Sequence, residues 1–315
     1  MAHKKQKMKA KGLADKIFFI VLFTFLVLYV ISILGTLFWG LLSSFKSVAD
    51  IEIKKNVLGL PNPVLSAEEL RFSNYAKLLD AFGFTVVNPF YQNGVMVTHY
   101  QEVTLGVTLV NTLMFTVITS IENAVLPCMA AYLCVRYPFK VSGFIYSTLL
   151  VLMVIPIVGT YPAEIEMLRS LGIYDTMIAY FIQNFNFTGM YFFIFYAYFE
   201  GLSTTYYEAA EIDGASQLMI MLKIALPLAF KLIMTIWLLR FIGHWNEYGT
   251  ILLYMPTQVT LAFVIYRTFI STMNGEHSVG EVTAGCTVLA FPLVIIFICF
   301  REQLMGNLTL GGEKG

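Results

Sequence analysis

The chain has 315 residues, 58% of them hydrophobic and only 13% charged, with a formal net charge of zero and a mean hydropathy of +0.73. An ordinary soluble domain carries about 25% charged residues, so this composition excludes such a domain and indicates a chain that lies in lipid. A net charge of zero gives no support to nucleic-acid binding.

Apolar runs long enough to cross a membrane recur along the chain. A helix needs about 20 apolar residues to span hydrocarbon about 30 Å thick. An isolated strand would leave its backbone polar groups unpaired there, so each run is expected to be helical. We therefore predict an all-α, polytopic membrane protein with six transmembrane helices, over approximately 17–42, 104–133, 142–162, 176–199, 229–253 and 279–300.

Lysines near the start of the chain set its expected orientation. Residues 1–16 are predicted to form a basic cytoplasmic N-terminus, because cytoplasmic segments are enriched in Lys and Arg. The run 17–42 is too long for a cleavable signal peptide and is interpreted as a retained first transmembrane helix. An even number of crossings then places the C-terminal tail, 301–315, in the cytoplasm.

Residues 43–103 are predicted to form an extracytoplasmic loop, which precedes a core transmembrane domain over 104–300. Ser66 and Glu69 have the spacing of a capping box, so a short helix is expected near 66–80. The loop is too short to hold a catalytic domain.

The sequence carries none of the common catalytic or metal-binding signatures. It lacks a GxxxxGK[ST] loop, an HExxH pair and a GxSxG turn, and its cysteines do not have zinc-type spacing. We expect no catalytic residue, no metal site and no cofactor bound by this chain, so any energy source lies on another chain. A membrane-embedded enzyme that uses Glu122, Glu247 or His244 stays open as an alternative, without paired carboxylates to support it.

The stretch 206–227, YYEAAEIDGASQLMIMLKIALP, lies in the largest predicted cytoplasmic loop, 200–228. A helix is expected from Tyr207 to Ile212. Gly214 allows a left-handed turn, Ser216 can cap a second short helix, and Pro227 stands where the chain re-enters lipid. Two short helices at an angle would form a rigid knob.

The side chains of this knob are expected to meet a partner. Ala209 and Ala210 would leave one side flat, and Asp213 is expected to cap the second helix. Apolar contacts are expected from residues that a lone loop could not bury: Ile212, Leu218, Ile220 and Met221.

The order of residues in the loop resembles a known motif. Glu-Ala-Ala at 208–210 is followed by three residues, Gly214, nine residues and Ile-Ala-Leu-Pro at 224–227. This matches the coupling loop of ATP-binding cassette (ABC) importer permeases. The rest of the chain resembles the shorter permease of maltose-type importers, in FKS at 45–47, VNTLMFT at 110–116, HWNEY at 244–248 and the terminal LTLGGEKG.

The resemblance implies a type I ABC importer permease fold in a bacterial cell membrane. It implies a heterodimer with a second permease, two copies of a cytoplasmic ATPase that holds ATP and Mg, and an extracytoplasmic solute-binding protein. The solute would be a sugar or oligosaccharide; a non-sugar solute such as a polyamine or phosphate stays open. Residues implied in coupling to the ATPase are Glu208, Ala209, Ala210, Ile212, Asp213, Gly214, Ala215, Leu218, Leu226 and Pro227.

Relative to short members of that family, residues 81–103 look like an insertion in the outer loop. Its role is not implied by the resemblance.

Polar residues in two of the apolar runs are candidates for a solute path. Amides and hydroxyls beside aromatic rings suit a sugar, although they could instead bond to neighbouring helices. The candidates are Gln183, Asn184, Asn186, Thr188 and Tyr191 in the fourth run, with Trp245, Asn246 and Glu247 in the fifth as pore lining or gate packing.

Glu122 and Arg240 lie at similar depths in the second and fifth runs. A lone charge at the bilayer centre is costly, so we expect these two side chains to form an ion pair.

Overall fold

The computed structural model describes residues 12–53, 56–61, 72–137, 140–155 and 159–305. The chain divides into two compact units, residues 1–78 with 274–287 (unit 1) and residues 79–273 with 288–315 (unit 2). The predicted capping box at Ser66 and Glu69 lies outside the described residues, as do most of the basic N-terminus and the end of the C-terminal tail.

Unit 1 begins with helix α1, Leu13–Ser43, which covers the predicted run 17–42. Its apolar window is not buried inside the unit at all, as expected for a surface that faces lipid. Beyond α1 the chain forms a short π-helix, Ala49–Ile53, and helix α2, Ser73–Asp80. Burial lowers the pKa of Lys46, whose Nζ donates to the carbonyl oxygens of Asn56 and Val57 at 2.8 and 2.9 Å.

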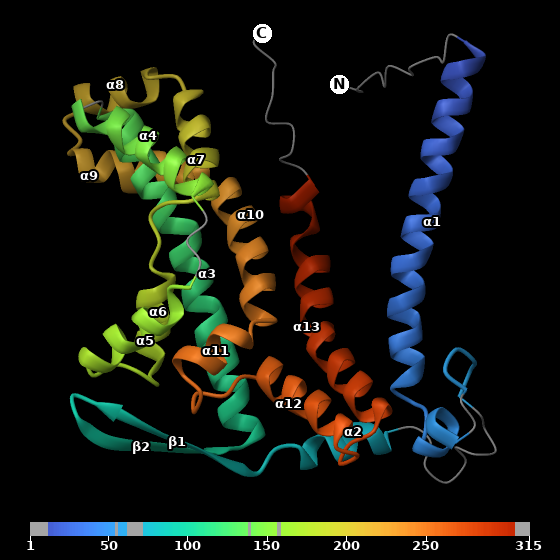
Figure 1. Ribbon diagram of the computed structural model, residues 1–315. Helices are drawn as coiled ribbons and strands as arrows, with labels where there is room; N and C mark the ends of the chain where they lie inside the picture. The colour runs from blue at the N-terminus through green and yellow to red at the C-terminus, as the bar shows by residue number, and fades with distance from the viewer. Residues whose placement is uncertain (1–11, 54–55, 62–71, 138–139, 156–158, 306–315) are drawn as a thin grey trace. The chain divides into compact units, whose positions relative to one another are not determined.

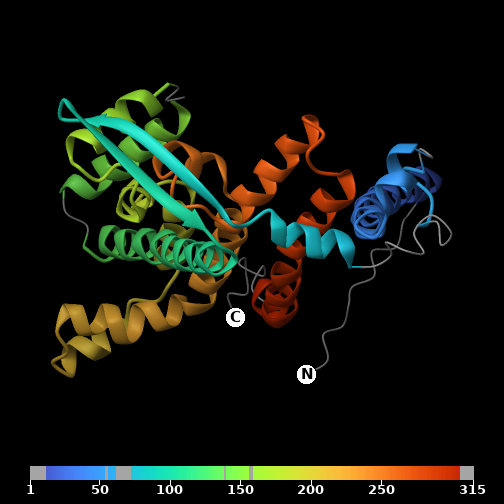
Figure 2. The same ribbon diagram turned by 90° about the horizontal axis from the view of Figure 1, so that it is seen from below.

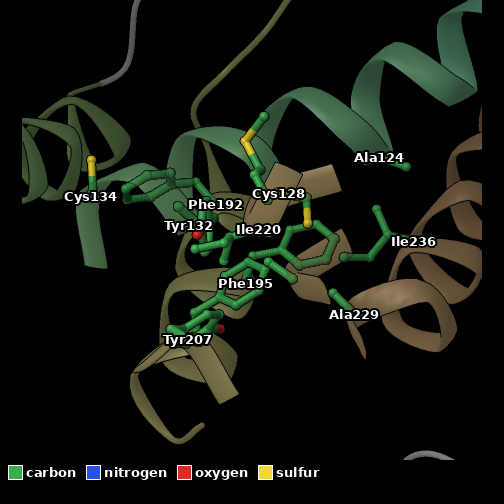
Figure 3. Packing of buried hydrophobic residues seen from close by; sticks show 14 of the residues in the cluster. Ala124, Cys128, Tyr132, Cys134, Phe192, Phe195, Tyr207, Ile220, Ala229 and Ile236 are labelled. Atoms are coloured by element: carbon green, nitrogen blue, oxygen red, sulfur yellow. The ribbon is translucent and has the colours of Figure 1, made fainter. Parts of the chain in front are cut away.

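The core of unit 2 consists of α3, Leu105–Arg136, α7, Met190–Glu200, and α10, Leu226–Trp245. Small residues of α3, among them Ala124 and Cys128, let the aromatic rings of α7 pack closely against it (Figure 3). Helix α4, Lys140–Val154, packs on the same cluster through Tyr146, whose ring lies 5.2 Å from that of Phe193.

Among the described residues, four helices are long and apolar enough to cross a membrane: Asp15–Ser43, Leu105–Arg136, Gln217–Trp245 and Val279–Arg301. They correspond to the first, second, fifth and sixth predicted runs. Most of the third run lies in the 15-residue α4, and α5, Tyr161–Ser170, begins at its end. Six membrane crossings therefore stay a prediction.

The fourth run, 176–199, is two helices rather than one. Helix α6, Met177–Asn184, ends before α7 begins. In the gap, the Oδ1 of Asn186 accepts hydrogen bonds from the backbone N–H and hydroxyl of Thr188 at 2.8 and 2.7 Å, and Gly189 has φ +94°. A side chain that bonds its neighbouring backbone competes with the helix, and the positive φ of Gly189, the N-cap of α7, is incompatible with a continuous helix here.

The fifth run also breaks. Asn246 caps the end of α10, and the Oε1 of Glu247 accepts a hydrogen bond from Thr250 N at 2.8 Å at the start of α11, Gly249–Tyr254. A further apolar helix, α12, Leu261–Met273, precedes α13, Val279–Met305. Helix α5, Tyr161–Ser170, lies beside α11, with the ring of Tyr161 6.3 Å from that of Tyr254.

Residues 81–103 contain a β-hairpin, so the all-α expectation is wrong at this place. Strands β1, Phe84–Gln92, and β2, Val95–Val103, pair antiparallel from Phe84 and Val103 to Gln92 and Val95 (Figure 2). The turn residues Asn93 and Gly94 both have positive φ, 51° and 79°. An Asn-Gly turn between alternating apolar strands is a strong hairpin signal, and it outweighs the helical surroundings.

Asp175 holds the hairpin on the rest of unit 2. Its side chain is fully buried and lies 3.2 Å from Nδ1 of His99. It also accepts hydrogen bonds from Asn88 Nδ2 at 3.0 Å and from the backbone N–H and hydroxyl of Thr257 at 2.9 and 3.0 Å. One carboxylate therefore joins both strands to the loop between α11 and α12. Phe90 adds apolar packing against Leu168 of α5.

Replacing Asp175 should free the hairpin. Asp175→Gly removes the acceptor but tolerates the positive φ of 60° at this position, and each buried donor left unpaired costs about 1–3 kcal/mol. We expect faster proteolysis within 84–103 and a lower Tm for the purified protein. Asp175→Asn keeps one acceptor oxygen and tolerates this φ. Its cleavage rate and Tm should therefore lie between those of the wild type and Asp175→Gly. A wild-type cleavage rate in Asp175→Gly would contradict this role.

Candidate functional site

The loop that resembles a coupling motif folds as two short helices around a glycine turn. Helix α8, Thr205–Ile212, ends where Gly214 takes φ +77°. Ala215 N donates to Ala210 O and Gly214 N donates to Glu211 O, each at 3.0 Å. This is the Schellman arrangement, which leaves the last carbonyls of α8 satisfied. The expected turn at Gly214 is confirmed.

The second helix is longer than expected. Helix α9, Gln217–Ile220, continues through a π-helical turn, Met221–Ala225, into α10, so Gln217–Trp245 forms one helix of 29 residues. Pro227 has no backbone N–H to continue the i to i−4 pattern, which accounts for the wider turn just before it. Pro227 therefore does not mark the start of the helix, which begins ten residues earlier at Gln217.

Ser216, and not Asp213, caps this second helix. The Oγ of Ser216 accepts a hydrogen bond from Met219 N at 3.3 Å. Asp213 is the C-cap of α8 and its backbone N–H donates to Ala209 O at 3.1 Å. The prediction for Ser216 is confirmed and that for Asp213 is wrong, because the Schellman turn places Asp213 at the end of the first helix.

A polar cluster ties the loop to the end of α3. Arg136 Nη2 lies 2.6 Å from Glu211 Oε1, and Gln217 Nε2 donates to the same oxygen at 3.0 Å. Tyr137 bonds to the carbonyl oxygen of the Gln217 amide. The guanidinium also covers the ring of Tyr207 at 5.1 Å. Both helices of the loop are thus fixed to the same end of α3, as Figure 1 shows.

The electrostatics of this cluster favour an ionised Glu211. The Gln217 amide and the Arg136 guanidinium lower the pKa of Glu211. Because hydrogen bonds and a positive charge stabilise the carboxylate, the contact is complete at neutral pH.

The loop presents one apolar and acidic face outward. Glu208, Ala209 and Asp213 are exposed, and the exposed fractions of Ile212 and Leu218 are 86% and 61%. No ion pair of Glu208 forms within the described residues.

Three residues expected on the outer face lie inside instead. Ala210, Ile220 and Met221 are buried in the cluster of α3, α7 and α10. Helical spacing accounts for this: Ala210 lies about 100° around the helix from Ala209, so the two cannot share one face. Of the remaining predicted residues, Ala215 and Leu226 are half-buried and support the loop, while Gly214 and Pro227 are exposed.

A second site lies at the break between α6 and α7. A hollow of about 260 Å³ is lined by polar groups and one ring: Asn123, Asn186, Thr188, Tyr191 and Arg240, together with Pro127, Gly189 and Met190. Three of the predicted path residues, Asn186, Thr188 and Tyr191, therefore come together, although the fourth run is not one helix. Whether a solute passes this hollow stays a prediction.

Most of the other predicted path residues bond to the backbone or pack in the core. Asn184 Nδ2 donates to Tyr180 O at 3.0 Å, and Asn246 Nδ2 donates to Ile242 O at 2.8 Å. Trp245 is buried, and its Nε1 donates to Leu289 O at 2.9 Å. Gln183 lies outside the lining of the hollow. Of the two roles expected for Trp245, packing fits its position.

The predicted ion pair between Glu122 and Arg240 does not form. Arg240 Nη2 donates instead to Asn123 Oδ1 at 2.6 Å, and neither charged residue has an ion pair within the described residues. Neighbouring side chains on a helix point about 100° apart, so α3 turns Asn123 toward α10 and Glu122 away. Equal depth was not enough to predict contact.

Sequence reasoning missed Asn123, Arg136 and Tyr137. Arg136 and Tyr137 stand in AAYLCVRYPFK at 130–140, at the end of an apolar run. A search for a cation able to meet Glu211 across the loop would have found Arg136. Asn123 gives no comparable signal, because its partner is 117 residues away.

The fold places the chain among multi-pass helical membrane proteins. Residues 123–305 match the family described as binding-protein-dependent transport system inner membrane component. The chain therefore belongs to this family of transporter permeases.

Curated relatives of the chain are sugar permeases. It is 25% identical to a trehalose transport system permease protein of Mycobacterium tuberculosis, over 66% of this chain and 76% of the relative. It is 22% identical to a diacetylchitobiose uptake system permease protein of Streptomyces coelicolor, over 96% and 91%. Among solved structures, a bacterial ABC transporter involved in the import of alginate has a chain with a TM-score of 0.66 at 22% identity, covering 92% of this chain and 98% of that chain.

The contact of Arg136 with Glu211 predicts a pH-dependent attachment of the loop. The pKa of Glu211 is lowered by folding, so its contribution to stability is present above the ordinary carboxyl pKa and is lost as the pH falls through the lowered value. We expect Arg136→Gln and Glu211→Gln each to lower the Tm at pH 7, with a combined effect smaller than the sum. At a pH below the lowered value, the effects should become additive; non-additivity that persists there would contradict the ion pair.

Proposed function

We propose that this chain is the permease subunit of an ATP-driven importer and that its loop 200–228 transmits movement from a cytoplasmic ATPase. The observation that carries this is an exposed face on a loop that the Arg136 cluster fixes to α3. The face consists of Glu208, Ala209, Ile212 and Leu218. Exposed Ile and Leu on a well-anchored surface are typical of a protein contact. The free carboxylate of Glu208 suits an Arg or Lys of the ATPase.

The link from the loop into the membrane supports transmission. Helix Gln217–Trp245 has 29 residues, about 43 Å at 1.5 Å per residue, and it carries part of the loop at one end and Arg240 near the hollow. The Arg136 cluster adds α3 to the same body. A movement of the loop would then be passed to α3 and α10, two of the helices that line the hollow.

The partners follow from this assignment. A second permease would complete the membrane pathway, and two copies of the ATPase would hold ATP and Mg, which this chain has no motif to bind. An extracytoplasmic binding protein would deliver the solute to the side of the hairpin, with both termini of the chain in the cytoplasm. The membrane is that of a bacterial cell.

A sugar or oligosaccharide is the proposed solute. The relatives named above are permeases for trehalose and diacetylchitobiose. The hollow between α6 and α7 supports this class, because it combines an amide, a hydroxyl and the Tyr191 ring. Such groups bond to the edge of a sugar and cover its face.

Coupling is tested by changing the loop without disturbing its anchor. Glu208→Lys should set like charges against the ATPase, where removing a partly desolvated partner can cost several kcal/mol. Gly214→Val should strain the turn at φ +77°. In the assembled transporter, both variants should insert and accept the external receptor but lose most solute-stimulated ATP hydrolysis and uptake.

The control is Glu200→Lys, the same charge reversal at an exposed acid at the end of α7, outside the two loop helices. It should keep near-normal activity. A Glu208→Lys, Gly214→Val double variant that co-purifies with the ATPase and transports at the wild-type rate would contradict the coupling proposal.

The solute path is tested at Asn186. Asn186→Ala should raise the KM for uptake by about tenfold. A lost hydrogen bond to the solute costs about 1 kcal/mol, and the turn between α6 and α7 also loses its bonds from Asn186 to Thr188. Asn246→Ala removes an exposed amide that lies outside the hollow and should leave the KM within about twofold. Equal KM values for the two variants would show that Asn186 does not line the path.

A further inference from the structure

We propose that the hollow around Arg240 binds a carboxylate of the transported solute, so that the importer carries acidic sugars such as uronate-containing oligosaccharides. This inference rests on the proposed importer function and names the solute class within it. It starts from a positive charge that the described chain leaves unbalanced.

Arg240 is a half-buried cation without an anionic partner among the described residues. It lies within the apolar helix Gln217–Trp245, and no carboxylate forms an ion pair with it among the described residues. Its Nε is buried and has no hydrogen-bond partner there. A charge inside a membrane helix normally faces a partner or a wet cavity. Here it faces the hollow.

One side of the guanidinium is already fixed. Asn123 Oδ1 accepts from Arg240 Nη2 at 2.6 Å. The Asn123 amide is held in this orientation because its Nδ2 donates to Thr119 O at 2.9 Å and to Asn184 O at 3.1 Å. Asn123 is therefore a positioning residue: it presents Arg240 to the hollow and supplies no charge of its own.

The free side of Arg240 suits a carboxylate. A guanidinium offers its donors as a planar fork that matches the two oxygens of a carboxylate. Asn123 occupies only one of these donors, and an amide oxygen leaves the positive charge uncompensated. A bound carboxylate would satisfy both the charge and the unpaired donors.

The rest of the hollow suits the sugar that carries this carboxylate. The Tyr191 ring lies 5.9 Å from the guanidinium carbon of Arg240, so a ring-shaped solute held by its acid group would lie near an aromatic face. Asn186 uses its Oδ1 for Thr188 and makes no other hydrogen bond in the described chain, which leaves its Nδ2 for a sugar hydroxyl. About 260 Å³ is enough for about one sugar ring, near the lower end of small-molecule sites.

The experiment compares paired sugars in the complete reconstituted transporter with its external receptor. Each pair is a labelled disaccharide that ends in a uronic acid and its neutral counterpart, in which a hydroxymethyl group replaces the carboxylate. The wild type should import uronate members. Arg240→Gln should lower their kcat/KM by roughly tenfold to a hundredfold, as expected for a lost charge-assisted bond, and change the neutral members by less than about twofold.

Two further variants separate recognition from stability. Arg240→Lys keeps the charge but not the fork, so it should retain an intermediate preference for uronates. Lys231→Gln removes a cation from the exposed side of the same helix and should leave the ratio of uronate to neutral uptake unchanged.

The outcomes are distinct. A wild type that imports only neutral members overturns the inference and leaves the importer function in place, and so does an Arg240→Gln variant that affects both members equally, which would indicate a counter-ion on the second permease. If no sugar enters at all, the sugar proposal fails and the inference with it.

Discussion

Inside lipid, every backbone N–H and C=O must find a partner within the protein, and the interrupted helices of this chain depend on how that requirement is met. The chain breaks twice within apolar runs, between α6 and α7 and between α10 and α11. At each break, side chains take over the bonds that a helix would have made. Asn186 supplies them at the first break, and Asn246 and Glu247 at the second.

The same requirement explains why only some of the polar residues predicted for a solute path line the hollow, while others bond to the backbone. A sequence shows amides and acids within an apolar run, but it does not show which of them repair the backbone. Asn184, Asn246 and Glu247 do so, whereas Asn186 both repairs the backbone and borders the hollow. The hollow exists because α6 and α7 do not continue into each other, so it depends on the break as much as on its lining.

Much of the loop 200–228 could be predicted because its signals are local. The positive φ of Gly214 and the cap at Ser216 follow from neighbouring residues, and both were expected. The burial of Ala210 could also have been derived from helical periodicity. Arg136 could not be placed in the same way, since its contact with Glu211 joins positions 75 residues apart.

The hairpin of β1 and β2 could also have been predicted from local signals, but the sequence analysis missed it. Its Asn-Gly turn and alternating strands are local and strong signals. The apolar runs elsewhere in the chain nevertheless favour an all-α prediction, which leaves no place for a hairpin. Its attachment through Asp175 was less accessible, because that carboxylate collects donors from positions 88, 99 and 257.

Charge within the membrane gives the last connection between fold and function. Helix rotation decides which of two neighbouring residues meets Arg240, and α3 offers it Asn123 rather than Glu122. An amide fixes the guanidinium in place without neutralising it. An ion pair with Glu122 would have neutralised the Arg240 guanidinium. The hydrogen bond to Asn123 instead leaves its positive charge directed at the hollow. Since the helix that carries this charge also begins at the loop, a movement of the loop would change the surroundings of Arg240 and, with them, the affinity for an anionic group.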